Sequence, residues 1–174
     1  NNSFTLDEPR QKFDDQLNKI GYNDFGATGS VKDYFMASSM GQFVPEFDVF
    51  GPVKLSQPYS YYGGDNTMTT DANAPEMIIE ACSLLDGQID FTQYDRDGDG
   101  AIDNVYVFYA GYGQADGGEA STVWPHSWDI RDAGRTFYFD GVQLGHYACS
   151  SELRDGRGQS ISGIGVFCHE FTHV

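Results

Sequence analysis

The last seven residues of the chain carry the most specific chemical signal in the sequence. Residues 168–174 read CHEFTHV and contain the motif H-E-x-x-H. Residues four apart on an α-helix lie on one face, so the imidazoles of His169 and His173 can bind the same ion. Zinc accepts neutral imidazole in tetrahedral sites, and a catalytic zinc keeps one position for water. The spacing therefore predicts two zinc ligands, with Glu170 as the general base that takes a proton from that water.

The residues ahead of the motif favour a helix. No proline intervenes, and Ser160 or Ser162 can cap the N-terminus. Cys168 is not expected to bind the same ion, because adjacent helical residues point about 100° apart. A catalytic zinc needs a third protein ligand, which these residues do not identify, and a coincidental surface pair of histidines is the alternative interpretation. Apolar side chains recur along this helix at spacings of three and four: Ile164, Phe167 and Phe171.

A second cation site is predicted at residues 95–103, which read DRDGDGAID. Alternate carboxylates converge on a hard cation in EF-hand loops, where a glycine supplies the sharp turn. The twelfth EF-hand position normally holds a glutamate, whereas Tyr106 stands there in this chain. A strand over residues 104–110 replaces the second EF-hand helix, so we expect a structural calcium site and not a sensor; an unoccupied acidic turn is the alternative. The predicted calcium ligands are Asp95, Asp97, Asp99, the backbone carbonyl of Ala101, and Asp103.

Composition limits the possible partners. Ten basic and 26 acidic residues give a net charge of −16, which disfavours binding to nucleic acid and to anionic membranes. No apolar run approaches the ~18 residues that a membrane span needs, and no secretory signal stands at Asn1. The acidity suits a protein that works outside the cell. Cys82, Cys149 and Cys168 allow at most one internal disulfide, and three buried thiols are the preferred interpretation.

The remaining pattern indicates a mixture of helices and strands. Helices are predicted at residues 7–20, 30–40 and 73–86, each followed by a glycine. A capping box of Ser30 and Asp33 begins the second, and Asn73 caps the third. Prolines break residues 42–62 into short extended pieces. The apolar run of residues 105–109 predicts a buried central strand, and Asp140-Gly141 predicts a hairpin between strands at residues 136–139 and 142–148.

Other polar side chains are candidates for stabilising an oxyanion during catalysis. His126 lies in the aromatic run WPHSW of residues 124–128. A structural role for His126, hydrogen-bonded near the core, is preferred to a metal or substrate role. The candidate donors are Tyr109, Tyr112, His126 and His146.

Several blocks, taken in order along the chain, resemble one known family. They are residues 23–35 (NDFGATGSVKDYF), 39–43 (SMGQF), 49–53 (VFGPV), 97–100 (DGDG), 110–113 (AGYG), 124–128 (WPHSW) and 166–174 (VFCHEFTHV). In this order they resemble the immune inhibitor A family of secreted bacterial metallopeptidases. Ordered blocks over residues 21–174 are far more specific than H-E-x-x-H alone.

The resemblance implies a fold and a site. It implies an α+β, zincin-like catalytic domain over residues 1–174, with a mixed twisted sheet, a backing helix and an active-site helix. The resemblance implies that His169 and His173 bind zinc, that Glu170 is the general base, and that the domain holds structural calcium. It also implies a chain truncated at both ends, because in such proteins a buried strand precedes the first helix and a Gly-Leu-Pro-Asp-like continuation follows the motif. The third zinc ligand is expected in that continuation.

The function expected from these features is that of a secreted or cell-surface bacterial zinc endopeptidase. Its partners would be protein or peptide substrates, aligned by strand addition on the sheet edge nearest the metal helix, which is expected at the hairpin of residues 136–148. The alternative is a calcium-stabilised binding or adhesion module with an incomplete zinc site, because the third ligand is not identified.

Overall fold

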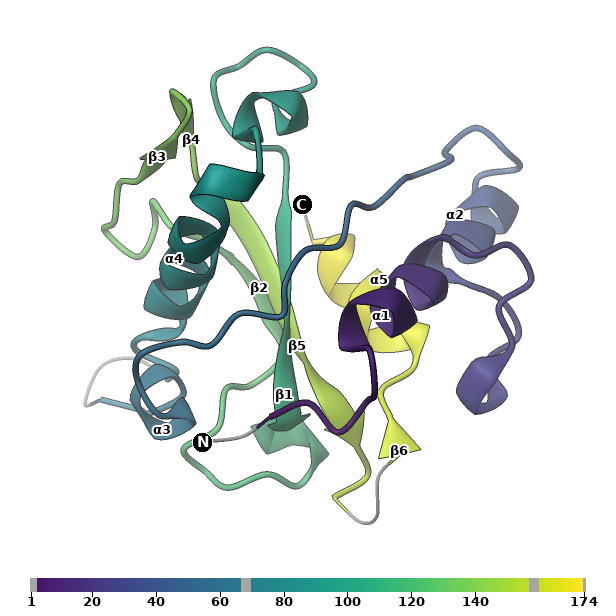
Figure 1. Cartoon of the computed structure of the whole chain (residues 1–174), viewed down its shortest axis with the longest axis horizontal. Helices are drawn as coiled ribbons and strands as arrows, with labels where there is room; N and C mark the ends of the chain where they lie inside the picture. The colour runs from purple at the N-terminus through teal and green to yellow at the C-terminus, as the bar shows by residue number, and fades with distance from the viewer. Residues whose placement is uncertain (1–2, 67–69, 157–159, 174) are drawn as a thin grey trace.

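A mixed β-sheet forms the centre of the fold in the computed structural model, which describes residues 3–66, 70–156 and 160–173 (Figure 1). β5 (His146–Arg154) pairs in parallel with β1 (Val105–Tyr112) on one side and antiparallel with β2 (His126–Asp129) on the other. The short β6 (Ser160–Ile161) pairs antiparallel with the end of β5. β5 is therefore the central strand, and its side chains are buried from Tyr147 to Leu153.

The prediction that residues 105–109 form the central strand is wrong in one respect. The strand forms, but β1 lies at an edge of the sheet as far as the described residues go, and its side chains are half-buried. Its outer edge faces a groove of about 1230 Å³ whose far wall includes the extended residues 43–55. An unbroken apolar run reports that both faces of a strand are covered, and it carries no information about how many of its edges are paired.

Helices cover the two faces of the sheet (Figure 1). On one face α4 (Ala74–Leu85) packs in a core with Val105, Val107 and Tyr109 of β1. The opposite face carries α1 (Pro9–Asn18), α2 (Val31–Ser38) and α5 (Ile164–Phe171), which share a second core with Tyr106 and Phe108 of β1. Smaller helices are α3 (Tyr59–Tyr62), η1 (Asp24–Gly26), η2 (Asp86–Gln88), η3 (Phe91–Tyr94) and η4 (Gln114–Asp116).

The predicted capping box at the start of α2 is confirmed. The Ser30 hydroxyl accepts a hydrogen bond from the Asp33 backbone N–H at 3.1 Å, and the Asp33 carboxylate accepts one from the Ser30 N–H at 2.9 Å. Met40 and Gly41 have φ angles of 54° and 79°, a left-handed turn that ends the helical segment where the sequence predicts. α4 also forms, but Asn73 does not cap it: the side chain donates to the Tyr61 carbonyl instead.

The hairpin around Asp140-Gly141 is confirmed, although its strands are shorter than predicted. β3 (Tyr138–Phe139) and β4 (Val142–Gln143) flank a turn in which both central residues have positive φ, 51° and 92°. Gln143 also bonds to the acidic loop: its N–H donates to the Gly100 carbonyl and its carbonyl accepts from the Ile102 N–H. The Leu144 N–H still donates to the Phe137 carbonyl within the hairpin, and the chain then leaves this small sheet before β5 begins at His146. The predicted single strand at residues 142–148 is therefore two separate elements.

A buried carboxylate joins the start of the chain to the central strand. Glu152 of β5 has no exposed surface. One oxygen accepts hydrogen bonds from the backbone N–H groups of Thr5 (2.7 Å) and Leu6 (2.9 Å), and the other from that of Gly111 (3.1 Å). These hydrogen bonds offset the free-energy cost of removing the Glu152 carboxylate from water. Part of the predicted loop at residues 154–160 lies outside the described residues, namely 157–159.

Candidate active site

The helix α5 carries His169 and Glu170 of the H-E-x-x-H motif and ends at Phe171, so His173 lies in the turn that follows it. The start of α5 also differs from the sequence prediction. Gly163 occupies the N-cap position, with no side-chain cap. Ser160 lies in β6, and the N–H of Ser162 donates to the carbonyl of Glu152. The start of α5 is therefore set by its connection to the sheet and not by a serine cap.

Aromatic packing holds α5 against the sheet. The ring of Phe167 lies 4.1 Å from that of Tyr106 on β1, measured between centroids. Phe171, one turn further along, packs at 5.6 Å against Phe35 of α2, and Phe47 of the extended segment contacts both α5 rings. With these contacts one side of α5 is buried, and the side that carries His169 and His173 remains exposed.

The geometry of the two histidines suits a single metal ion. Their Nε2 atoms lie 3.2 Å apart and the rings are nearly perpendicular, at 85°. A zinc ion about 2.0–2.1 Å from each nitrogen at a tetrahedral angle requires a separation of roughly 3.3 Å. Glu170 is 8% exposed, and one of its oxygens lies within 4.8 Å of the ligand nitrogens of both histidines. The residues present therefore fit zinc.

The acidic loop gathers part of its predicted ligand set. Carboxylate oxygens of Asp95, Asp97 and Asp99 lie within 4.8 Å of one another. The Gly100 N–H donates to Asp95 Oδ2 at 3.1 Å, so the glycine supplies the predicted turn. Asp103 is outside this cluster, and its carboxylate accepts from the Arg96 N–H at 3.3 Å. Ala101 forms a β-bridge with Gln143, which connects the loop to β4.

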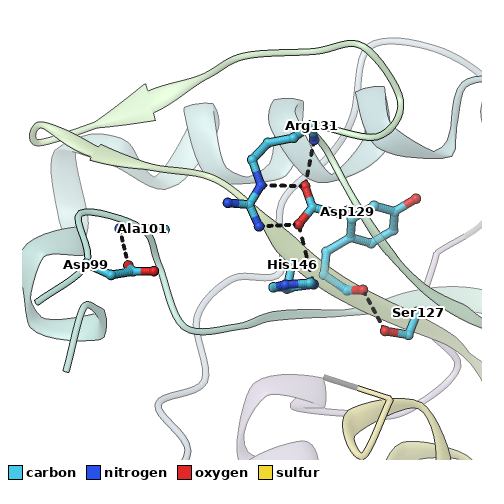
Figure 2. A network of polar contacts seen from close by, with 7 residues as sticks. Asp99, Ala101, Ser127, Asp129, Arg131 and His146 are labelled. Atoms are coloured by element: carbon cyan, nitrogen blue, oxygen red, sulfur yellow. Dashed lines mark hydrogen bonds and ion pairs between the residues drawn. The ribbon is translucent and has the colours of Figure 1, made fainter. Parts of the chain in front are cut away.

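A polar network that the sequence did not predict lies at the start of β5 (Figure 2). Asp129 of β2 is buried, and its carboxylate accepts hydrogen bonds from Arg131 Nε at 2.9 Å and Nη2 at 2.6 Å. His146 Nδ1 lies 3.4 Å from Asp129 Oδ2. The hydrogen bonds from Arg131 hold the pKa of Asp129 below its usual value, against the opposing effect of burial. Only the pairing of β2 with β5 brings His146 to this carboxylate, and no sequence motif signals that pairing.

Two of the candidate oxyanion donors are engaged within the fold. His126 Nδ1 lies 2.6 Å from the carbonyl of Trp124, and Nε2 lies 2.9 Å from the hydroxyl of Tyr147. A carbonyl can only accept, so the proton is on Nδ1 and Nε2 accepts from the tyrosine. The hydrogen bonding predicted for His126 is therefore confirmed. The Tyr109 hydroxyl donates to the carbonyl of Val123 at 2.6 Å.

The three cysteines are free and buried, as predicted. Burial raises the pKa of the Cys82 thiol to about 12 and that of Cys168 to about 11. Burial, as the largest cause, also raises the pKa of Cys149 above its usual value. The thiols are therefore protonated at neutral pH and behave as small apolar side chains.

Comparison with known proteins agrees with this geometry. Residues 10–174 match the family described as immune inhibitor A peptidase M6, catalytic domain. The chain belongs to the peptidase M6 family. Two curated relatives, both named pre-pro-metalloprotease PrtV, come from Vibrio cholerae serotype O1 strains M66-2 and ATCC 39315 (El Tor Inaba N16961). Each is 28% identical over 182 residues, which cover 87% of this chain and 20% of the relative.

The M6 assignment confirms the resemblance seen in the sequence. The chain spans about a fifth of the length of the curated relatives that it matches. The α+β character and the mixed sheet are also as expected. Within the described residues, no helix is both long enough and apolar enough to cross a membrane.

Proposed function

We propose that residues 1–174 form a zincin-like catalytic domain of a secreted zinc endopeptidase that hydrolyses peptide bonds in protein substrates. The observation that carries the proposal is the pair of imidazole Nε2 atoms 3.2 Å apart at the C-terminal end of α5, with the Glu170 carboxylate beside them. M6 family membership supports the same chemistry.

His169 and His173 would hold the zinc, and Glu170 would handle the protons. Zinc held there would supply Lewis-acid polarisation of the scissile carbonyl and would lower the pKa of a bound water to about 7. Glu170 takes a proton from the attacking water and then delivers it to the leaving amine, so one carboxylate serves as base and acid.

The edge strand β2 is the element we propose for substrate alignment. β2 lies at the end of the sheet opposite β1, and α5 packs across both β2 and β5. An extended peptide can add to such an edge through backbone hydrogen bonds. The hairpin that the sequence suggested for this purpose forms a separate two-stranded sheet, so β2 replaces it in the proposal.

We also propose a structural calcium ion at Asp95, Asp97 and Asp99. Three converging carboxylates and the hydrogen bond from Gly100 to Asp95 support an EF-hand-type arrangement. The ion would offset the mutual repulsion of these charges. Because Ala101 of this loop pairs with Gln143, the calcium ion would also stabilise the contact between the acidic loop and β4.

Secretion is proposed from two observations. The curated relatives carry the name pre-pro-metalloprotease, and this chain has a net charge of −16. The competing function, a calcium-stabilised binding or adhesion module, is kept because the metal cluster on α5 contains two imidazoles and no third among the described residues.

Two variants of the full-length protein test the proposal. Glu170→Gln should retain zinc and lose turnover of a casein-type substrate by a factor of about 10² to 10⁴, which is the usual contribution of a general base. His173→Ala should lose stoichiometric zinc as measured by metal analysis. Unchanged turnover in Glu170→Gln would reject the base, and a parent protein that binds calcium but no zinc would favour the binding module.

A further inference from the structure

His146 lies on the same face of the sheet as the metal helix. Residues in register on neighbouring strands direct their side chains to the same face. Tyr106 of β1, which packs on Phe167 of α5, is in register with Ala148 of β5. Strand residues two apart share a face, so His146 lies on the α5 face together with Asp129, its register partner on β2.

His146 also lies toward the metal end of α5. α5 and β5 run in opposite directions, so the C-terminal end of α5 lies toward the start of β5 (Figure 1). From Phe167 to His169 the helix advances about 3 Å, and His173 lies in the turn beyond its C-terminal end. From Ala148 back to His146 the strand covers about 7 Å in the same direction. The imidazole of His146 and the proposed zinc ligands are therefore at the same end of the same face.

The network around Asp129 orients the His146 ring. Asp129 is fixed by Arg131, and it faces Nδ1 of the imidazole. In the neutral tautomer with the proton on Nδ1 facing this carboxylate, Nε2 on the far side of the ring is an acceptor. The His146 side chain is 47% exposed, and no hydrogen bond to Nε2 occurs within the described part of the chain.

We propose that His146 is a substrate-binding residue, whose Nε2 accepts a hydrogen bond from a backbone N–H of a peptide that lies along β2, and that Asp129 and Arg131 are its positioning residues. The proposal rests on the peptidase function proposed above. The Asp129–Arg131 pair alone would serve a purely structural role. The half-exposed His146 ring buries little surface and therefore adds little to stability.

The test uses the full-length protein with Glu170→Gln as background, so that binding is measured without cleavage. A fluorescein-labelled casein peptide is titrated and its anisotropy recorded. Adding His146→Ala should weaken binding about 3- to 10-fold, the value of one hydrogen bond. His146→Gln places an amide oxygen near the same position and should restore most of the affinity. Tyr138→Ala is the control, because Tyr138 is 58% exposed on the separate hairpin.

Kinetics in the parent background separate binding from folding. With Glu170 present, His146→Ala should raise KM by the same factor and change kcat less than about twofold, because the bond is present before and during reaction. Zinc content and Tm should stay at the parent values. Equal peptide affinity in His146→Ala, or a lowered Tm without rescue by glutamine, would overturn the proposal. A Glu170→Gln protein that still cleaves peptide would instead reject the base assignment.

Discussion

Replacing Arg131 tests whether the buried Asp129 carboxylate depends on its partner. Arg131→Met keeps the aliphatic length of the side chain but removes both guanidinium hydrogen bonds to Asp129. Hydrogen bonds to charged groups contribute about 1.5–3 kcal/mol each to stability when buried. The Arg131 side chain is 43% exposed, so solvent screens the pair and a total loss of about 2 kcal/mol is expected at pH 7.

The stability that Arg131→Met loses should be smaller at acidic pH than at neutral pH. The hydrogen bonds from Arg131 lower the folded-state pKa of Asp129. The stabilisation is therefore fully present above the unfolded-state pKa of about 3.9, and it disappears as the pH falls through the lower folded-state value. The difference in the free energy of unfolding between the parent and Arg131→Met should be constant near neutral pH and should become smaller below about pH 4.

Urea unfolding followed by tryptophan fluorescence measures this gap. Arg135→Met is the matched control, because Arg135 pairs with Glu76 at 2.7 Å on the surface, where both side chains are about a third or more exposed. Arg135→Met should lower the free energy of unfolding by about 0.5 kcal/mol or less. Equal losses in the two arginine variants, or an Arg131→Met gap that stays constant down to pH 3, would refute the reasoning.

Two further predictions concern the α2 cap and the acidic loop. Ser30→Ala removes the hydroxyl that accepts from the Asp33 N–H and should lower the free energy of unfolding, measured in urea, by about 1 kcal/mol. Millimolar calcium should raise the Tm of the parent, and Asp97→Asn should reduce that increase, because one of three converging carboxylates is lost. A calcium response that is the same in parent and Asp97→Asn would contradict the proposed site.

Local sequence signals predicted the elements whose causes are local. The capping box at Ser30, the left-handed turn at Gly41 and the hairpin at Asp140-Gly141 depend on residues within a few positions of one another. The H-E-x-x-H spacing is local in the same sense, since one helical turn brings His169 and His173 together. These features could be predicted because no distant contact decides them.

Features decided by distant contacts could not be predicted in the same way. β5 reads HYACSSELR, and its buried Ser150, Ser151 and Glu152 hide its central position. Their burial is tolerated only where hydrogen-bond partners are supplied, as Asp116 does for Ser151. The Asp129–His146 contact likewise depends on strand pairing across 17 positions. A hydrophobic pattern cannot report either arrangement.

The bonds between Glu152 and the segment at Thr5 and Leu6 have a consequence for biosynthesis. Thr5 and Leu6 cannot dock until position 152 has left the ribosome, because the acceptor of their backbone N–H groups is the Glu152 carboxylate. At typical translation rates of about 5–20 residues per second, the early segment waits on the order of ten seconds or more for its partner. Closure over such a long loop is also intrinsically slow. The nascent chain is therefore exposed to aggregation and proteases until nearly all of these residues have been synthesised.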